Sequence, residues 1–255
     1  MLLTVLGCSG SIPGPSSPAS GYLVDAGGAR LAVDLGNGTL GTLQRHADPL
    51  SLDALLFSHL HPDHFADFSA LTVLRRYHPN PRVDPRVAKL PVYAPGEAPT
   101  RFAAQYAPDT AELAETDLSD VYDFRAWPVE ARINGIGVRV ARVAHPCEAY
   151  GLRLEHGGRT LVYTGDSGAC DALTELADGA DVLLAEASLT HAENRPPDLH
   201  LSGREAGELA EAARVGRLIL THVPPWTDPD AVLEEAKAAF GGEVQLAELS
   251  ARYEV

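Results

Sequence analysis

The chain has 255 residues, of which 45% are hydrophobic, so it can bury a sizeable core in one large domain or two small ones. Acidic residues outnumber basic ones 35 to 20, which gives a formal net charge of −15. Such a surface repels long polyanions and disfavours extended contact with DNA or RNA. No apolar run approaches the roughly 18 residues of a membrane span, and the N-terminus lacks the pattern of a secretion signal, so we expect a cytoplasmic protein.

Short apolar runs bounded by Gly, Asp, Pro or His recur along the chain and predict strands. They cover Leu2–Leu6, Tyr22–Val24, Arg30–Val33, Ala54–Phe57, Pro91–Tyr93, Val138–Val143, Gly151–Leu154, Thr160–Tyr163, Val182–Ala185 and Leu218–Leu220. Helical patterns lie between them, at Phe65–Tyr77, Arg101–Tyr106, Cys170–Ala177, Ser202–Val215 and Asp228–Phe240. This order predicts a single α/β domain over residues 1–255, with two mixed sheets packed face to face and helices outside.

Local signals refine this outline. Ser202 and Glu205 have the spacing of a capping box, and Asp228 before Pro229 indicates a helix start. Residues 78–99 are rich in proline and show little periodicity, which predicts a long surface loop or insertion. Cys8, Cys147 and Cys170 are too widely spaced for a disulfide framework; Cys147 follows His145 closely and is either a packed thiol or a neighbour of a metal.

The most informative stretch is the motif His59-Leu60-His61-Pro62-Asp63-His64, directly after an apolar run. His59 and His61 are spaced to grip one cation from the same side of an extended segment. Asp63 and His64 follow where the chain must turn, and they can reach a second cation nearby. Imidazole nitrogens with a carboxylate oxygen suit zinc, with manganese or iron as substitutes.

Four other polar residues stand where predicted strands end: Asp34, His145, Asp166 and His222. The ends of neighbouring strands converge in space, so these side chains can meet the loop that carries His59. Singly, each is typical of a strand cap or a hydrogen-bonded turn. Together they supply the number of ligands that a two-metal hydrolytic site needs.

These residues resemble the successive motifs of the metallo-β-lactamase superfamily, over nearly the whole chain. The resemblance implies a four-layer αββα sandwich with two divalent metal ions, most readily Zn, at one edge. It implies the following roles: His59, His61 and His145 hold one ion, Asp63, His64 and His222 hold the other, Asp166 bridges them, and Asp34 orients a ligand histidine. A hydroxide held between the ions would be the nucleophile.

Two further segments, Ala185–Ser188 and His200–Ser202, resemble motifs of the RNase Z-like branch. There the histidine assists the leaving oxygen and the glutamate orients it, which implies catalytic roles for His200 and Glu186. The alternative is a buried pair or a cap on the following helix. RNase Z itself uses a protruding basic arm, and this sequence has none.

Longer strings, among them Gln44–Pro49, Pro197–Gly203 and Thr221–Thr227, are similar to an actinobacterial group of atypical class II cyclic-nucleotide phosphodiesterases. This likeness implies hydrolysis of 3′,5′-cyclic AMP to 5′-AMP, a small phosphodiester substrate, and, as for RNase Z-like relatives, a homodimer. Arg75 and Arg76 are candidates for phosphate capture, and Tyr77 and Trp226 for stacking on the base. An RNA 3′-processing nuclease and a hydrolase of another ester class stay open as alternatives.

Overall fold

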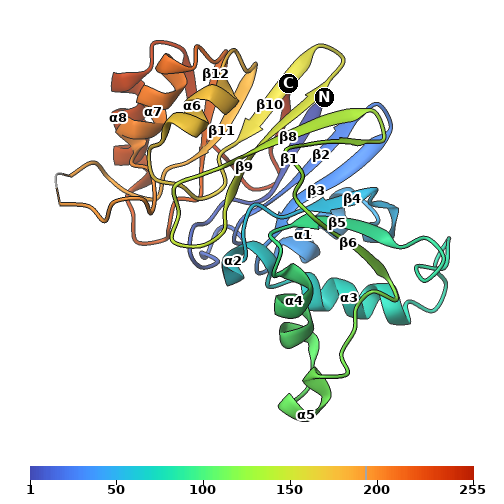
Figure 1. Cartoon of the computed structure of the whole chain (residues 1–255). Helices are drawn as coiled ribbons and strands as arrows, with labels where there is room; N and C mark the ends of the chain where they lie inside the picture. Colours follow the sequence, from blue (N-terminus) through green and yellow to red (C-terminus); the bar gives the residue numbers. More distant parts are fainter. Residues whose placement is uncertain (193) are drawn as a thin grey trace.

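The computed structural model describes residues 1–192 and 194–255. Within these residues, two mixed seven-stranded sheets face each other and carry helices on their outer surfaces (Figure 1). The first sheet runs in the order β14 (Arg252–Glu254), β1 (Leu2–Gly7), β2 (Gly21–Ala26), β3 (Ala29–Leu35), β4 (Ala54–Leu56), β5 (Leu90–Ala94), β6 (Tyr122–Ala126). The second runs β13 (Glu243–Leu246), β12 (Arg217–Thr221), β11 (Val182–Glu186), β10 (Arg159–Tyr163), β9 (Tyr150–His156), β8 (Ile136–Arg142), β7 (Glu130–Ile133). The predicted α/β sandwich is confirmed.

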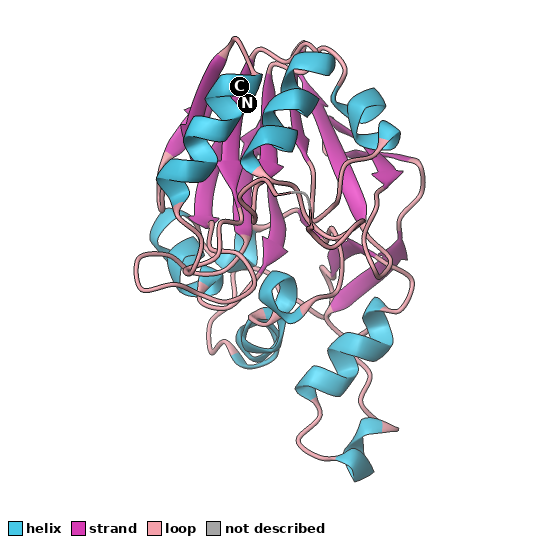
Figure 2. Cartoon of the chain, turned by 90° about the vertical axis from the view of Figure 1, so that its left-hand side faces the viewer, coloured by secondary structure: helices cyan, strands magenta, loops and turns pink. Residues whose placement is uncertain are grey.

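The helices divide between the two outer faces, as the two perpendicular views show (Figures 1 and 2). The first half of the chain contributes α1 (Thr39–His46), α2 (Pro62–Phe65), α3 (Phe68–Tyr77), α4 (Ala98–Tyr106) and α5 (Thr110–Leu113). The second half contributes α6 (Asp171–Ala177), α7 (Gly203–Ala212) and α8 (Pro229–Ala239). In the described part of the chain, no helix combines the length and apolarity needed to cross a membrane.

Alternate residues of the inner strands face different cores. In β1, Leu3 packs between the sheets and Leu6 packs under the helices. In β10, Leu161 joins the inter-sheet core while Val162 packs against the helices of the second half. Because both faces of these strands are covered, their sequences are continuous apolar runs, which is why the strands could be predicted.

The predicted helix starts are present. Ser202 and Glu205 form a reciprocal capping box at the start of α7, and Asp228 accepts a hydrogen bond from the backbone N–H of Asp230 at the start of α8. These caps satisfy backbone donors that a helix leaves unpaired in its first turn.

The helix predicted over Phe65–Tyr77 is present from Phe68 as α3, but it does not begin at Phe65, because the chain breaks between α2 and α3. Asp67 lies at the break. Its backbone N–H donates to the carbonyl of Leu35, and its carboxylate accepts from the N–H of Leu40 at 2.8 Å. These two contacts tie the turn after the histidine motif to β3 and α1, and they hold that motif against the sheet.

Residues 78–89 form a loop, but the loop does not run to residue 99 as predicted. Residues 90–94 form β5, which lies inside the first sheet between β4 and β6, and α4 begins at Ala98. Leu90 and Val92 pack under the helices, whereas Tyr93 faces the inter-sheet core. Burial on both faces therefore outweighs the hydrogen bond that Pro91 cannot donate, and β5 contains the strand predicted at Pro91–Tyr93.

Candidate metal centre

The predicted metal ligands meet at one edge of the sandwich, where strands of both sheets end. In the first sheet, β3 and β4 are parallel neighbours. In the second sheet, β11 is parallel to both of its neighbours, β10 and β12. Parallel neighbours end at the same edge. The loops after β4, β8, β10 and β12 and the short helix α2 therefore converge there with the following residues: His59, His61, Asp63, His64, His145, Asp166 and His222.

Three imidazoles form the first donor group. Nδ1 of His61 lies 3.0 Å from Nε2 of His59 and 3.1 Å from Nε2 of His145. A tetrahedral zinc ion with Zn–N bonds of about 2.0–2.1 Å separates its ligand atoms by about 3.3 Å. The three nitrogens therefore have the spacing of ligands around one ion of this kind.

Asp63, His64 and His222 form the second donor group. Oδ2 of Asp63 lies 3.4 Å from Nε2 of His64 and 3.7 Å from Nε2 of His222. All three atoms are buried, and none has a hydrogen-bond partner among the described residues. Buried polar atoms without partners are costly, so three of them directed at one point fit a bound cation.

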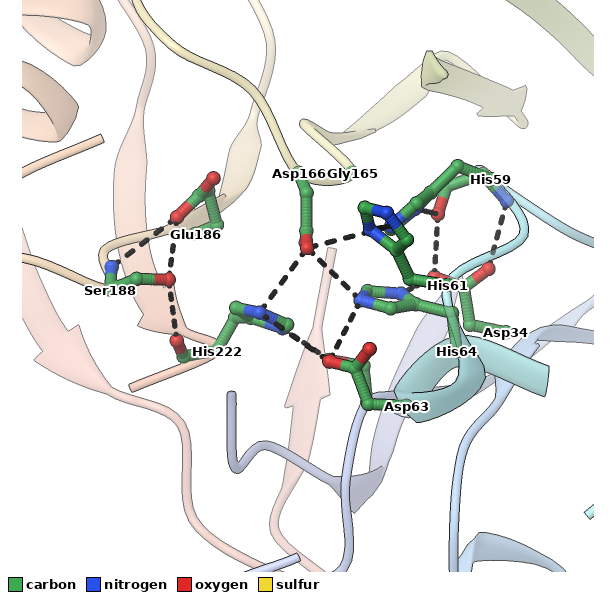
Figure 3. Close-up of polar contacts among 12 residues, drawn as sticks. Asp34, His59, His61, Asp63, His64, Gly165, Asp166, Glu186, Ser188 and His222 are labelled. Atoms are coloured by element: carbon green, nitrogen blue, oxygen red, sulfur yellow. Dashed lines mark hydrogen bonds and ion pairs between the residues drawn. The ribbon is translucent and has the colours of Figure 1, made fainter. Parts of the chain in front are cut away.

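One carboxylate serves both groups. Oδ2 of Asp166 lies 3.6 Å from Nε2 of His59, 3.2 Å from Nε2 of His64 and 3.3 Å from Nε2 of His222 (Figure 3). A carboxylate can bind cations on both sides, which a neutral imidazole cannot. Asp166 thus occupies the position that the sequence resemblance assigns to a bridging ligand.

Asp34 fixes the orientation of His64 from behind. Its Oδ2 accepts hydrogen bonds from Nδ1 of His64 at 2.8 Å, from the hydroxyl of Tyr163 at 2.9 Å and from Oγ of Ser58 at 2.8 Å. Oγ of Ser58 also lies 3.1 Å from Nδ1 of His59. Because the outer nitrogens are occupied, the inner nitrogens face the donor groups, as in known metal sites.

The same arrangement recurs on the other side of the centre. Nδ1 of His222 lies 2.8 Å from Oγ of Ser20, and Nδ1 of His145 donates to the carbonyl of Leu199 at 2.9 Å. The carbonyl can only accept, so it sets the tautomer of His145 that leaves Nε2 free for a metal, and Ser20 orients the ring of His222. Ser20 and Ser58 were not predicted, although Ser58 directly precedes the histidine motif.

Burial and mutual repulsion keep most of these imidazoles neutral. Burial lowers the pKa of His59 well below its ordinary value, and the charge on His64 lowers it further. Burial likewise lowers the pKa of His61, His145 and His222. Neutral imidazole is the form that binds metal, so four of the five histidines need to release no proton on metal binding.

The carboxylates around the centre favour the protonated form of the fifth histidine, His64. Burial raises the pKa of Asp63, but its close approach to His64 outweighs this and lowers the pKa to about 2. Burial lowers the pKa of His64, yet the charges of Asp166 and Asp34 raise it well above its ordinary value. A bound divalent cation would balance the same carboxylates that raise this pKa.

Two glycines allow the ligand loops to pack closely. A Cβ atom on Gly36 would lie 1.9 Å from the backbone oxygen of Asp63, and one on Gly10 would lie 2.2 Å from that of His222. His222 itself has a φ of 57°, a left-handed conformation that is uncommon outside glycine and often found at functional sites. The sequence carried no signal for these contacts, because they join segments far apart in the chain.

Glu186 and His200 adjoin both donor groups. Oε1 of Glu186 accepts from Nδ1 of His200 at 2.8 Å and from the N–H of Ser167, and Oε2 accepts from the hydroxyl of Ser188 at 2.9 Å. Burial lowers the pKa of His200, but its hydrogen bond and ion pair with Glu186 raise it to about 9. His200 is therefore a cation at neutral pH, and Glu186 and Asp166 form a third cluster with it.

Comparison with known proteins agrees with this donor set. The family model described as the Beta-lactamase superfamily domain matches residues 21–223. The chain belongs to this superfamily. One similar protein is a probable metallo-hydrolase, YhfI of Bacillus subtilis, which is 31% identical to this chain over 97% of both chains. Together with the histidine and aspartate cluster, this identifies the protein as a metal-dependent hydrolase.

Two further relatives and one crystal structure are similar to this chain over most of its length. An uncharacterized protein of Mycobacterium leprae is 51% identical over 95% of this chain and 84% of its own length. A ribonuclease Z of Mycobacterium bovis is 31% identical over 89% of this chain and 87% of its own length. The crystal structure of YhfI superposes with a TM-score of 0.85 at 28% identity and covers 99% of both chains.

Arg75 and Arg76 were predicted to capture phosphate, but the structure shows both side chains in internal contacts. Arg75 is only 4% exposed and donates to the carbonyls of Val121 and Ala88. Arg76 pairs with Asp120 at 2.7 Å. Both guanidinium groups brace the end of α3 against the β5–β6 region. The prediction failed because a sequence shows positive charge but not whether that charge is already bound.

The two aromatic candidates differ. Tyr77 is 66% exposed on α3 and lines a groove with Val73 and Tyr106, away from the superfamily's metal-binding residues. That groove contains none of the predicted metal ligands, and stacking of Tyr77 on a base stays a prediction. Trp226 is 67% exposed in the loop between His222 and α8, and its role stays a prediction.

Proposed function

We propose that this hydrolase is a phosphodiesterase that cleaves 3′,5′-cyclic nucleotides and converts cyclic AMP to 5′-AMP. The observation that supports it most is the position of His200, which Glu186 holds beside both donor groups. The alkoxide that leaves a phosphodiester is a poor leaving group and needs a proton. An imidazolium whose pKa is about 9 carries that proton at neutral pH.

The donor groups account for the rest of the chemistry. His59, His61 and His145 would hold one divalent ion, Asp63, His64 and His222 the other, and Asp166 would contact both. When bound, such a pair supplies charge neutralisation at phosphate and an activated water. Glu186 occupies Nδ1 of His200, which leaves Nε2 to deliver a proton to the 3′ oxygen as the P–O bond breaks.

A ribonuclease Z relative at 31% identity makes an RNA 3′-processing nuclease the second candidate. The formal charge of −15 opposes it, because a polyanionic substrate gains affinity from positive surface charge. Arg75 and Arg76 do not supply that charge, since both are held in internal contacts. We therefore favour a small substrate with a single phosphodiester.

Assays of the purified protein with added Zn, Mn or Fe test the proposal. Cyclic AMP, cyclic GMP, a transfer RNA precursor and bis-p-nitrophenyl phosphate are compared, with a His59→Ala/His61→Ala variant to exclude contaminating enzymes. We expect cyclic nucleotides to be hydrolysed with the highest kcat/KM. Faster cleavage of the RNA would establish the second candidate, and activity on the nitrophenyl ester alone would retain the chemistry but reject the substrate.

A further inference from the structure

A small cavity of about 210 Å³ opens beside the first donor group. Its lining comes from the histidine motif, the start of α4 and the loop after β8: Leu60, His61, Pro95, Glu97, Arg101, Cys147 and Glu148. Complete sites for small molecules measure about 300–1,000 Å³, so this one suits a single flat ring system. Because His61 belongs to both the cavity and the donor group, a molecule held by the metal-binding residues can extend into it.

Two ionisable groups in this cavity have no strong partner. Arg101 makes one long contact, 3.5 Å from its Nη2 to the carbonyl of Leu60, and its guanidinium lies 5.9 Å from the ring centre of Phe65. In the described part of the chain, neither Arg101 nor Glu97 takes part in an ion pair, although they are one helical turn apart. Both side chains are exposed and available to a ligand.

The third charged side chain of the cavity, Glu148, is held in place by its neighbours. Glu148 accepts a hydrogen bond from the hydroxyl of Tyr150 at 2.7 Å and lies 3.8 Å from Arg142. The cavity therefore presents two carboxylates and one guanidinium between apolar walls from Leu60 and Pro95. This charge balance disfavours a second phosphate. It favours a neutral flat group with N–H donors for the carboxylates and ring acceptors for the guanidinium.

We propose that this cavity binds the nucleobase of the substrate, with Glu97 accepting from an exocyclic amine and Arg101 stacking on or donating to the ring. The identity of the ligand rests on the proposed function, because a nucleotide is what that function would bring to the metals. Binding of the base itself requires no hydrolysis. The two ideas can thus be tested separately.

Adenosine and purine riboside provide a matched pair of probes, since they differ only in the exocyclic amine, which purine riboside lacks. Calorimetric titration of the zinc-loaded protein should show adenosine binding about tenfold more tightly than purine riboside, the effect of one hydrogen bond to a charged group. Glu97→Ala should abolish this preference. Arg101→Ala should weaken both nucleosides, whereas Arg45→Ala and Glu175→Gln, exposed residues that do not line the cavity, should change neither.

Equal affinity for the two nucleosides, no binding of either, or unaltered binding by both cavity variants would overturn the assignment. Hydrolysis of cyclic AMP is measured in parallel. Wild-type protein that selects adenosine but does not cleave cyclic AMP would reject the proposed function and support the cavity. Cleavage of cyclic AMP without selection of adenosine would do the reverse.

Discussion

Nδ1 of His64 donates to Oδ2 of Asp34 across 2.8 Å, and this contact aims Nε2 of His64 at Asp63 and Asp166. Asp34 is 1% exposed and belongs to neither donor group, although it contacts the outer nitrogen of His64. Its φ of 55° places it in the left-handed region. The residue thus accepts backbone strain at a position from which it controls a ligand without being one.

Replacing Asp34 by Asn should lower zinc affinity about 10–100-fold, the usual cost of losing the outer partner of a ligand histidine. Asn tolerates the left-handed conformation, so the change tests the carboxylate and not the backbone. Competitive titration against a chelator measures it. Asp123→Asn, which loses an exposed pair with Arg125, is the control, and an affinity equal to wild type would remove Asp34 from the site.

The Asp63→Ala variant should bind one metal ion fewer per chain and lose most of its hydrolytic activity. Asp63 belongs to the second donor group alone, whereas Asp166 belongs to both, so Asp166→Ala should weaken every bound ion. Elemental analysis after gel filtration gives the stoichiometry. Full activity of Asp63→Ala would show that the second group is not needed for catalysis.

In the His200→Ala variant, metal content should be unchanged while cleavage of cyclic AMP slows by about a hundredfold or more. The loss should be smaller for bis-p-nitrophenyl phosphate, since nitrophenolate leaves without a proton. His46→Ala, an exposed histidine on α1, is the control. An unchanged rate would reduce His200 to a structural partner of Glu186.

Glu186 should set the alkaline limit of activity. His200 acts as a cation, so the rate holds at pH values below its pKa of about 9 and falls as the pH rises through it. Glu186→Gln removes the charge that raises this pKa, and the falling limb should therefore move to lower pH. The pH profile of kcat for cyclic AMP measures the shift, and a limb at the wild-type position would contradict the pairing.

Gly36→Ala should destabilise the protein and reduce its metal content, because the added Cβ meets the backbone oxygen of Asp63 at 1.9 Å. Gly41→Ala on α1 is the matched control. Its Cβ has no neighbour within 4 Å, and alanine should raise helix stability there by up to about 1 kcal/mol. Thermal unfolding monitored by circular dichroism compares the two, and equal effects would argue against a tight contact.

The histidine and aspartate groups that meet at this edge could be predicted, because their chemistry and their place after apolar strands both show in a linear sequence. Ser20 could not, since it reaches His222 only once the sheet that contains β2 packs against the sheet that contains β12. Arg75 was misjudged for the same reason: burial depends on residues far away in the chain. The edge strands β6, β7, β13 and β14 were missed because their exposed faces make their sequences polar.

Strand β14 also has a consequence for how the chain folds. It pairs antiparallel with β1, and the N–H of Val255 donates to the carbonyl of Met1 at 2.9 Å. Until residues 252–254 have been synthesised, β1 is an open, apolar edge that can pair with another chain. His222 likewise joins the centre only after β12 forms. Chains interrupted during synthesis would therefore combine an incomplete metal centre with an aggregation-prone edge.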